Sequence, residues 1–410
     1  MNPIYKFILL LIPLLTILWP VSPEKRGSFC QGTGKIQNYA NLDSIKIKSQ
    51  NVRIVFWNVE NLYDPYDDTT RLDDEFTPQG AKHWTYGKFI RKLNYVAKTL
   101  LSIGQWSAPS LVGLCEVENR YVLNKLIYET PLKNYKYKII HHESPDLRGV
   151  DVALLYRSDH FKILSNRCIS IRFPFDTLSQ TREILMVKGI VRNRDTLILF
   201  VNHWPSRRGG YLSSQPRRNH VARVLRHLVD SIQGNQTFSV NDQRVGGSRN
   251  AHNQKQPSPA RQSPELRNGI PYCQEVSRPQ NIVIMGDFND EPEDESIRVV
   301  LNARSDTAVA DAGSLFDLMG IRNRTRKEGT LKYRDQWSTF DQFMVSGTLL
   351  KGLQGLRTRA GRVTVFRSSF LLENDNTYFG EKLNRTYVGP RYHGGFSDHL
   401  PVVLDLRQVD

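Results

Sequence analysis

Ile282-Val283-Ile284-Met285-Gly286-Asp287-Phe288-Asn289-Asp290 is the stretch of sequence that decides the fold. Its apolar beginning is typical of a buried strand. The carboxylates and the amide that follow lose water at the strand end, which is unfavourable unless they hold a metal ion or a substrate. Gly286 lets a second backbone approach closely. The stretch therefore predicts a core strand that presents Asp287 and Asn289 to a functional site, with a simple strand-closing turn as the alternative.

Four other segments end an apolar run with the same kinds of side chain. They are Val55-Phe56-Trp57-Asn58-Val59-Glu60, Leu114-Cys115-Glu116, Val201-Asn202-His203-Trp204 and Phe396-Ser397-Asp398-His399. One such strand end is common, but five in one chain indicate that the ends converge. Carboxylates, amides and histidines together suit a hard divalent cation and the hydrolysis of phosphate esters.

In order and residue type, the five segments resemble the endonuclease/exonuclease/phosphatase superfamily, which includes deoxyribonuclease I, sphingomyelinases and inositol phosphatases. Gly-Asp-Phe-Asn-Asp and Ser-Asp-His-Leu-Pro are the specific parts, and the resemblance runs from about Asn51 to Leu406. It implies an α/β four-layer sandwich. Two packed, mainly antiparallel or mixed β-sheets would be flanked by helices, with the active site at one edge.

Glu116, Glu60 and Asp398 are the expected metal ligands. Glu116 has the clearest strand-end context. Asn58 and Glu60 are two residues apart on a strand, so both are expected to face one cleft. The resemblance implies Mg²⁺ as the cofactor, with Mn²⁺ or Ca²⁺ as alternatives, and makes Asn58 an amide that orients the phosphate or a ligand. For each carboxylate, a solvated strand-end charge is the alternative.

The catalytic groups follow from the same resemblance. It places Asp287 close to the attacking water or the leaving group, and Asn289 as an amide that holds the transition state. Asp398 and His399 are neighbours, so in an extended segment they must point in opposite directions and do different jobs. His399 is expected to meet the phosphate or to activate water, with Asp341 as the acid that orients it.

A basic turn follows the second expected histidine. His203 matches a histidine of many family members and is expected to donate a proton or a hydrogen bond. Arg207 and Arg208, followed by two glycines, are expected to bind phosphates, with an ordinary basic turn as the alternative. Arg148 is a further expected phosphate contact. Gln342 stands where many members carry a histidine.

The pattern of strands and helices favours an α/β fold. Helices are expected over 86–103 and 217–232, and Lys92 lies off the apolar face of the first. Core strands are expected near 52–57, 111–115, 136–141, 150–156, 161–172, 184–190, 196–202, 282–286, 338–345 and 400–406. The four cysteines lack metal-site spacing, and a Cys168–Cys273 disulfide stays open.

The composition and the N-terminal segment indicate where the protein acts and which partners it binds. The chain has 410 residues, a formal charge of +15 and a pI of about 9.6, which favours a polyanionic partner or simply solubility. Residues 1–24 are expected to be a signal peptide or signal anchor, with a buried helix as the alternative. A linker is expected at 25–50. The family domain would occupy 51–410, with a disordered insertion at 233–280, where apolar residues nearly vanish.

The leading prediction is an exported, Mg²⁺-dependent phosphodiesterase, with an endonuclease acting on DNA or RNA as first choice. It would be a monomer, and periplasmic, extracellular or membrane-anchored. The alternative is a lipid or sugar-phosphate phosphodiesterase or phosphatase, sphingomyelinase-like or inositol-phosphatase-like. A non-catalytic binding protein is a third hypothesis, and the site residues all being present disfavours it. An exposed aromatic or aliphatic hairpin near the site would favour a lipid substrate, whereas a basic groove crossing the site would favour nucleic acid.

Overall fold

The computed structural model describes residues 51–409, with gaps at 106, 235–278, 308–309 and 327. The expected signal segment, the linker and residues 235–278 of the expected insertion lie outside the described residues. The insertion begins and ends at one place, because the side chain of Gln233 exchanges two hydrogen bonds with the backbone of Gln280, at 3.2 and 2.9 Å. None of the described helices has the length and apolar character that a bilayer crossing needs.

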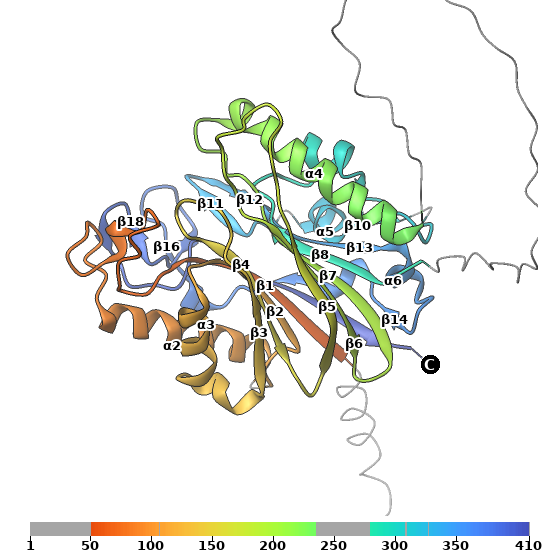
Figure 1. Ribbon diagram of the computed structural model, residues 1–410, viewed down its shortest axis with the longest axis horizontal. Helices are drawn as coiled ribbons and strands as arrows, with labels where there is room; N and C mark the ends of the chain where they lie inside the picture. Colours follow the sequence, from red (N-terminus) through yellow and green to blue (C-terminus); the bar gives the residue numbers. More distant parts are fainter. Residues whose placement is uncertain (1–50, 106, 235–278, 308–309, 327, 410) are drawn as a thin grey trace, which may run out of the picture. The chain divides into compact units, whose positions relative to one another are not determined.

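Two mixed sheets form the described domain (Figure 1), as the resemblance implied. In the first sheet the order is β14-β20-β1-β2-β4-β3, and β15 also pairs with β20. β1 runs parallel to β2 and antiparallel to β20. The bounds are β14 (Leu356–Arg357), β20 (Val402–Gln408), β1 (Asn51–Leu62), β2 (Leu111–Val117), β4 (Asp151–Arg157), β3 (Tyr137–His141) and β15 (Val363–Val365).

The second sheet has the order β5-β6-β7-β8-β13-β10-β9, and its central pair β7 and β8 is parallel. Three short hairpins, β11 with β12, β16 with β17 and β18 with β19, lie outside the two sheets. The second sheet comprises β5 (Phe161–Ile169), β6 (Ile184–Val191), β7 (Asp195–His203), β8 (Ile282–Asp287), β13 (Asp341–Ser346), β10 (Leu315–Asp317) and β9 (Ala303–Arg304). The hairpin strands are β11 (Leu331–Tyr333), β12 (Gln336–Ser338), β16 (Leu372–Asn374), β17 (Glu381–Leu383), β18 (Tyr387–Val388) and β19 (Arg391–Tyr392).

Helices cover the outer faces. The helices are α2 (Tyr86–Ile103), α3 (Arg120–Tyr128), α4 (Tyr211–Gln233), α5 (Leu318–Arg326) and α6 (Gly347–Lys351), with short helical turns η1 (Asp74–Phe76), η2 (Pro131–Tyr135), η3 (Ser296–Val300), η4 (Ala360–Arg362) and η5 (Ser369–Leu371). α2 has the predicted bounds, and the side chain of Thr85 caps it by accepting from the amide of Lys88. The second helix was expected from 217 but begins at Tyr211, and Pro216 lies inside it. Proline is tolerated most easily in the first turn of a helix, so a helix start close to Pro216 was expected. The observed helix begins more than one turn earlier, and the expected start was therefore too late.

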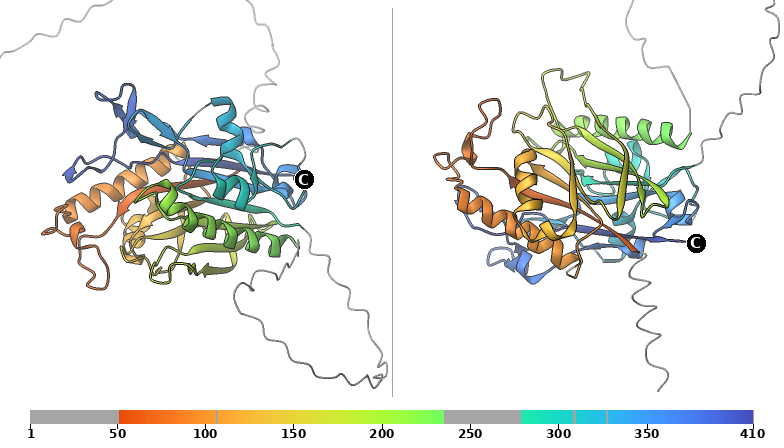
Figure 2. Two further views of the ribbon diagram at one scale, coloured as in Figure 1. Left: turned by 90° about the horizontal axis from the view of Figure 1, so that it is seen from above. Right: turned by 60° about the horizontal axis from the view of Figure 1, so that its bottom comes forward.

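The apolar run of β7 shows why the layers pack as they do. Leu197, Leu199 and Val201 point into the core shared with the first sheet, whereas Ile198 and Phe200 pack under α4. Successive side chains on a strand point to opposite faces, so a run that is apolar throughout must be covered on both sides. Figure 2 shows α4 and the sheets from two further directions. The two parallel pairs, β1–β2 and β7–β8, end at the same edge of the sandwich, where side chains from the two sheets contact each other.

No disulfide joins cysteines within the described part of the chain. Cys115 is buried in β2, as expected for a core residue, and Cys168 is half-buried in β5. Cys273 lies outside the described residues, so the Cys168–Cys273 pairing stays open.

Candidate active site

The five predicted strand ends converge. The Nδ2 of Asn58, from the first sheet, donates to Oδ2 of Asp287, from the second, at 3.1 Å. Trp57 donates from Nε1 to the carbonyl of His399 at 2.9 Å, which ties the Ser-Asp-His segment to β1. Gly286 packs against Asn202 so closely that a Cβ there would lie 2.6 Å from the Asn202 Cβ. The glycine is needed because β7 and β8 approach each other at the site.

Left-handed backbone marks three of the strand ends. Glu60 (φ 52°), Glu116 (φ 58°) and Asn289 (φ 52°) all have positive φ. Such conformations cost roughly 1–3 kcal/mol for residues other than glycine, and they persist where the surroundings hold them, often at functional sites. Asn58 contacts Asp287, whereas Glu60 accepts hydrogen bonds from the amides of Thr386 and Tyr387, and the register of β1 shifts between Asn58 and Leu62. The shared cleft expected for Asn58 and Glu60 stays a prediction.

A buried carboxylate orients His399. Nδ1 of His399 lies 2.7 Å from Oδ2 of Asp341, and Nε2 lies 3.8 Å from Oδ2 of Asp287. The predicted Asp341–His399 contact is therefore confirmed. Burial opposes protonation of the imidazole, but the charges of Asp341 and Asp287 outweigh it and raise the pKa of His399 well above its usual value. His399 is thus an imidazolium at neutral pH, fixed between two acids.

Asp287 is a buried carboxylate with a near-neutral pKa. Burial raises the pKa of Asp287 to about 6, while His399 and the amide of Asn58 oppose the rise. Its Oδ1 accepts from the backbone N–H of Asn289 at 3.0 Å, so the strand-closing turn is present and at the same time fixes the carboxylate. The Nδ2 of Asn289 donates to the carbonyl of Trp204 at 3.1 Å.

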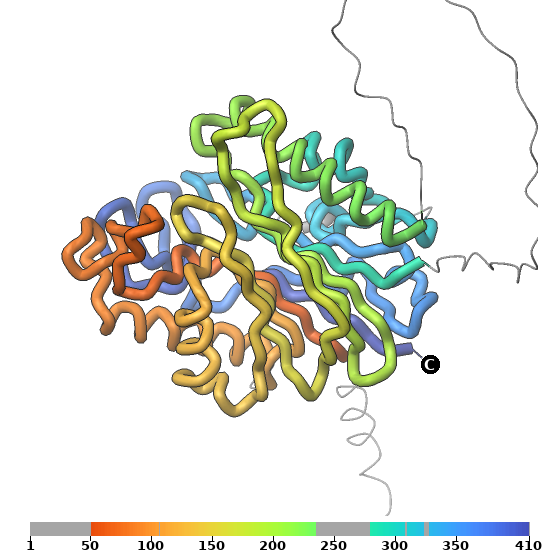
Figure 3. The backbone as a smooth tube through the Cα atoms, viewed as in Figure 1, coloured from red at the N-terminus to blue at the C-terminus, as the bar shows by residue number. Residues whose placement is uncertain are grey.

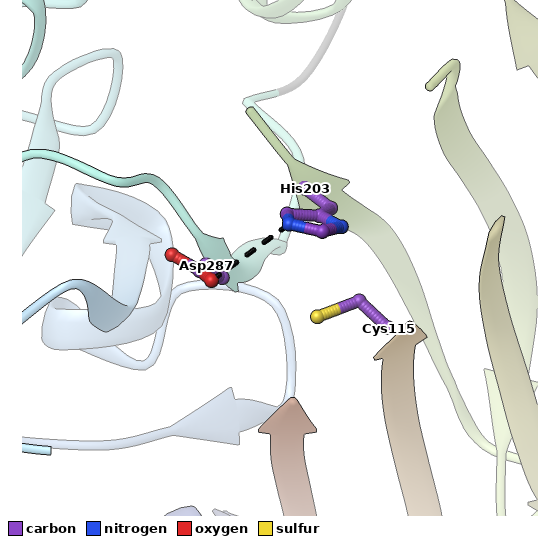
Figure 4. A group of neighbouring side chains, drawn as sticks. All are labelled: Cys115, His203 and Asp287. Atoms are coloured by element: carbon purple, nitrogen blue, oxygen red, sulfur yellow. Dashed lines mark ion pairs between the residues drawn. The ribbon is translucent and has the colours of Figure 1, made fainter. Parts of the chain in front are cut away.

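His203 approaches the same carboxylate from β7. Its Nε2 lies 3.8 Å from Oδ2 of Asp287 and 3.9 Å from Oε1 of Glu116. Figure 4 shows His203, Asp287 and Cys115 converging from the ends of three strands. Burial, and then the charges of Arg182 and Arg148, lower the pKa of His203 well below its usual value. His203 is therefore a neutral imidazole, unlike His399.

The carboxylates of Glu116 and Asp287 fit a hard divalent cation, whereas the buried thiol of Cys115 does not. Glu116 keeps one oxygen near His203 and accepts from the amide of Asn61 with the other, at 3.0 Å. The site contains two groups of three side chains, and within each group the possible ligand atoms lie within 4.8 Å of one another. One group is Cys115, His203 and Asp287, and the other is Asp287, Asp341 and His399. The buried Nδ1 of His203 has no hydrogen-bond partner within the described part of the chain. Among the carboxylates Glu116, Asp287 and Asp341, the side chain of Glu116 is the most exposed to solvent.

Glu60 and Asp398 form a second charged group beside Glu116. Arg385 pairs with Asp398 at 2.8 Å and with Glu60 at 3.5 Å. Glu60 also accepts from the amides of Thr386 and Tyr387, at 2.6 and 3.3 Å. Burial and the charge of Asp398 raise the pKa of Glu60. Asp398 and His399 do point to different partners, as the sequence required, and the metal roles of Glu60 and Asp398 stay predictions.

Two cations of this group were not found from the sequence. Lys92 was placed off the apolar face of its helix, yet it is 2% exposed and donates to Thr386 and to the carbonyl of Phe396. Desolvation lowers the pKa of Lys92 to about 8. Arg385 lies in a stretch with no recognisable pattern. The local sequence around Lys92 does not distinguish a buried lysine from a solvent-exposed lysine on the same helix.

The predicted arginines divide into two kinds. Arg207 ion-pairs with Asp290 at 3.0 Å and with Asp294, so its charge is satisfied within the protein. The guanidinium holds the 289–294 loop, and its role as a phosphate contact stays a prediction. Arg148 and Arg208 line a pocket of about 300 Å³ beside His203. Arg182 and Arg217, which the sequence did not single out, line it too.

A family model described as Endonuclease/Exonuclease/phosphatase family matches residues 53–241 and 237–408. Among curated proteins, none matches the chain at a significant level.

Several solved structures are similar to this chain. The human Nocturnin catalytic domain with a bound sulfate anion has 14% sequence identity, covers 88% of this chain and 95% of its own, and gives a TM-score of 0.47. Truncated Caenorhabditis elegans TDP2 has 14% identity, covers 88% and 100%, and gives a TM-score of 0.45. A mannosyl-6-phosphatase from Bacteroides thetaiotaomicron has 13% identity, covers 87% and 99%, and gives 0.47.

Proposed function

The chain belongs to the endonuclease/exonuclease/phosphatase family and is a metal-dependent phosphoric ester hydrolase; from that premise we propose that it is an exported, Mg²⁺-dependent phosphodiesterase that cleaves nucleic acid. The observation that carries the proposal is the row Asp341–His399–Asp287 beside Glu116 and His203. These neighbouring side chains would supply one base, one charged donor and one neutral imidazole to the reaction.

The base is Asp287. With a pKa of about 6, its carboxylate is ionised at neutral pH yet remains basic enough to accept a proton from an attacking water. The hydrogen bonds from Asn58 and from the amide of Asn289 hold both oxygens in place. A divalent cation, when bound, neutralises charge on the phosphoryl oxygens, and Glu116 is the residue that would hold it.

The two histidines serve different purposes. His399, kept positively charged by Asp341, donates a hydrogen bond to a phosphoryl oxygen whose charge grows in the transition state. His203 is neutral and faces Asp287 and Glu116, so it positions the reacting groups without adding positive charge. Such preorganised donors commonly contribute about 10²–10³-fold to the rate.

The pocket beside His203 supports a polyanionic substrate. Arg208 is exposed there and has no ion-pair partner within the described part of the chain, while Arg148 adds a second guanidinium. A nucleic acid carries further phosphates on either side of the bond that is cleaved, and these arginines would bind one of them. The net charge of +15 supports the same substrate.

A specific observation also favours the alternative substrate. The turn between β16 and β17 exposes Phe379 (88%) and Tyr378 (44%), and Arg385, which pairs with Asp398, follows this hairpin directly. Exposed aromatic side chains suit an apolar or interfacial surface. A phosphodiesterase that acts on lipid headgroups is therefore the second candidate.

One experiment separates the substrates. The purified protein is given plasmid DNA, RNA, sphingomyelin and bis(p-nitrophenyl) phosphate, each in Mg²⁺ and in EDTA, with Asp287→Asn as the inactive control. We expect nucleic acid to be cleaved in Mg²⁺ only. Cleavage of sphingomyelin alone would establish the second candidate, and cleavage in EDTA would refute the metal dependence. Recovery of the native chain only in the cytoplasm after cell fractionation would refute export.

A further inference from the structure

A second basic pocket lies at the edge of the first sheet opposite the active site. It has a volume of about 450 Å³. Asn51 at the start of β1 and Leu406 near the end of β20 line it, and the backbones of Asn51 and Arg407 are partners in the sheet. Figure 3 shows β1 (red) starting and β20 (blue) ending at this edge. Asn58 lies seven residues further along β1, roughly 23 Å at about 3.3 Å per residue.

Five cationic side chains line this pocket, and none of them has an ion-pair partner among the residues that the structure describes. They are Lys351, Arg357, Arg359, Arg362 and Arg407. Single arginines without an ion pair also occur elsewhere on the surface of the described part of the chain, for example Arg208. What distinguishes this pocket is that five such cations line one concavity.

The single carboxylate of the pocket does not offset this charge. Both oxygens of Asp405 accept from the guanidinium of Arg53, each at 2.8 Å, in a bidentate pair. The carboxylate is therefore already neutralised by a cation outside the lining. The five remaining positive charges line one concavity, and Arg357 and Arg407 are cross-strand partners in the sheet, so like charges repel one another there. An anion bound between them would relieve that repulsion.

We propose that the pocket lined by Lys351, Arg357, Arg359, Arg362 and Arg407 binds a phosphate-bearing anion. Guanidinium groups match phosphate oxygens with paired N–H donors, and several can share one dianion. The volume admits a phosphorylated headgroup or a small phosphate ester. The phosphate is carried by a lipid headgroup or by a free compound, and both present the same oxygens. Because the site lies roughly 23 Å from Asn58, it is separate from the hydrolytic centre.

The test uses the full chain in EDTA, so that no metal holds phosphate at the active site. The variant is the triple replacement Arg357→Gln, Arg359→Gln and Arg362→Gln. The matched control is Arg167→Gln, Arg223→Gln and Arg334→Gln, which removes the same charge from exposed positions outside the pocket. Binding is measured by calorimetry with inorganic phosphate and with glycerol 3-phosphate. It is also measured by flotation with phosphatidylglycerol-containing vesicles against vesicles of pure phosphatidylcholine.

We expect the wild type and the control to bind at least one probe, and the pocket variant to bind it on the order of tenfold or more weakly. Binding of the soluble probes identifies a free phosphate compound, and binding of anionic vesicles alone identifies a headgroup. No binding of either kind, or equal loss in variant and control, would overturn the proposal. Hydrolysis of bis(p-nitrophenyl) phosphate in Mg²⁺ should be unchanged in the pocket variant, so this proposal and the proposed function fail independently.

Discussion

Replacing Asp341 by asparagine is expected to slow hydrolysis while leaving the fold intact. Asp341 is fully buried, and its Oδ2 lies 2.7 Å from Nδ1 of His399. Asparagine has the same shape and can still accept that hydrogen bond, so the change removes the charge and little else. Without it, burial is opposed only by the remaining acids, so the pKa of His399 falls and the imidazole loses its proton at lower pH. We therefore expect the positive donor to be lost from the transition state.

The magnitude follows from the interaction that is lost. A hydrogen bond to a charged group contributes about 1.5–3 kcal/mol. Each 1.36 kcal/mol changes a rate tenfold, so kcat/KM should fall by about 10–10²-fold for Asp341→Asn. Asp341→Ala also removes the orientation of the ring and should lose about 10³-fold. Adding Asp341→Ala to His399→Ala should cost little more, because groups that act as one unit are not additive.

The assay is a pH profile of kcat/KM with bis(p-nitrophenyl) phosphate in saturating Mg²⁺. The raised pKa of His399 means that its active, protonated form is lost only as the pH rises through that value. In Asp341→Asn this alkaline loss should move to lower pH. Asp317→Asn, at a buried aspartate of β10 outside the site, is the matched control and should leave the profile unchanged. Fully additive losses, or an unmoved alkaline limb, would refute the role of Asp341.

Three further changes have defined outcomes. Glu116→Ala should weaken metal affinity or activity on the order of 10–100-fold, and full turnover in ordinary Mg²⁺ would remove it from the metal site. Asp287→Asn should abolish turnover without lowering Tm at pH 7. The pKa of Asp287 is raised to about 6 in the folded protein, so above that pH its ionised carboxylate opposes folding. A lower Tm of Asp287→Asn would contradict this. Wild-type activity should fall as the pH drops through about 6. Lys92→Met should lower stability by roughly 3 kcal/mol, because it strips the buried contacts to Thr386 and Phe396, and an unchanged Tm in scanning calorimetry would show that Lys92 is replaceable.

The sequence alone determined the elements and most of the chemistry. An apolar run that ends in Gly-Asp-Phe-Asn-Asp is a local feature, so β8 and Asp287 could be found without coordinates. The helical period of α2 is local too, and its bounds were predicted correctly. The Asp341–His399 pair followed from the resemblance, and the structure confirms it. Each of these inferences needs only neighbouring residues or the order of motifs.

Only the tertiary structure decided where several of these side chains point. Strand alternation placed Asn58 and Glu60 on one face, and only the structure shows that they contact different partners across a register shift and a left-handed turn. Arg207 was expected to contact phosphate from its place after His203, and only the structure shows its ion pair with Asp290 of the 289–294 loop. Lys92 looked solvated on its helix and proved to lie under segments of the chain nearly 300 residues away. Burial and ion pairing depend on contacts between distant segments, and no local pattern in a single sequence specifies them.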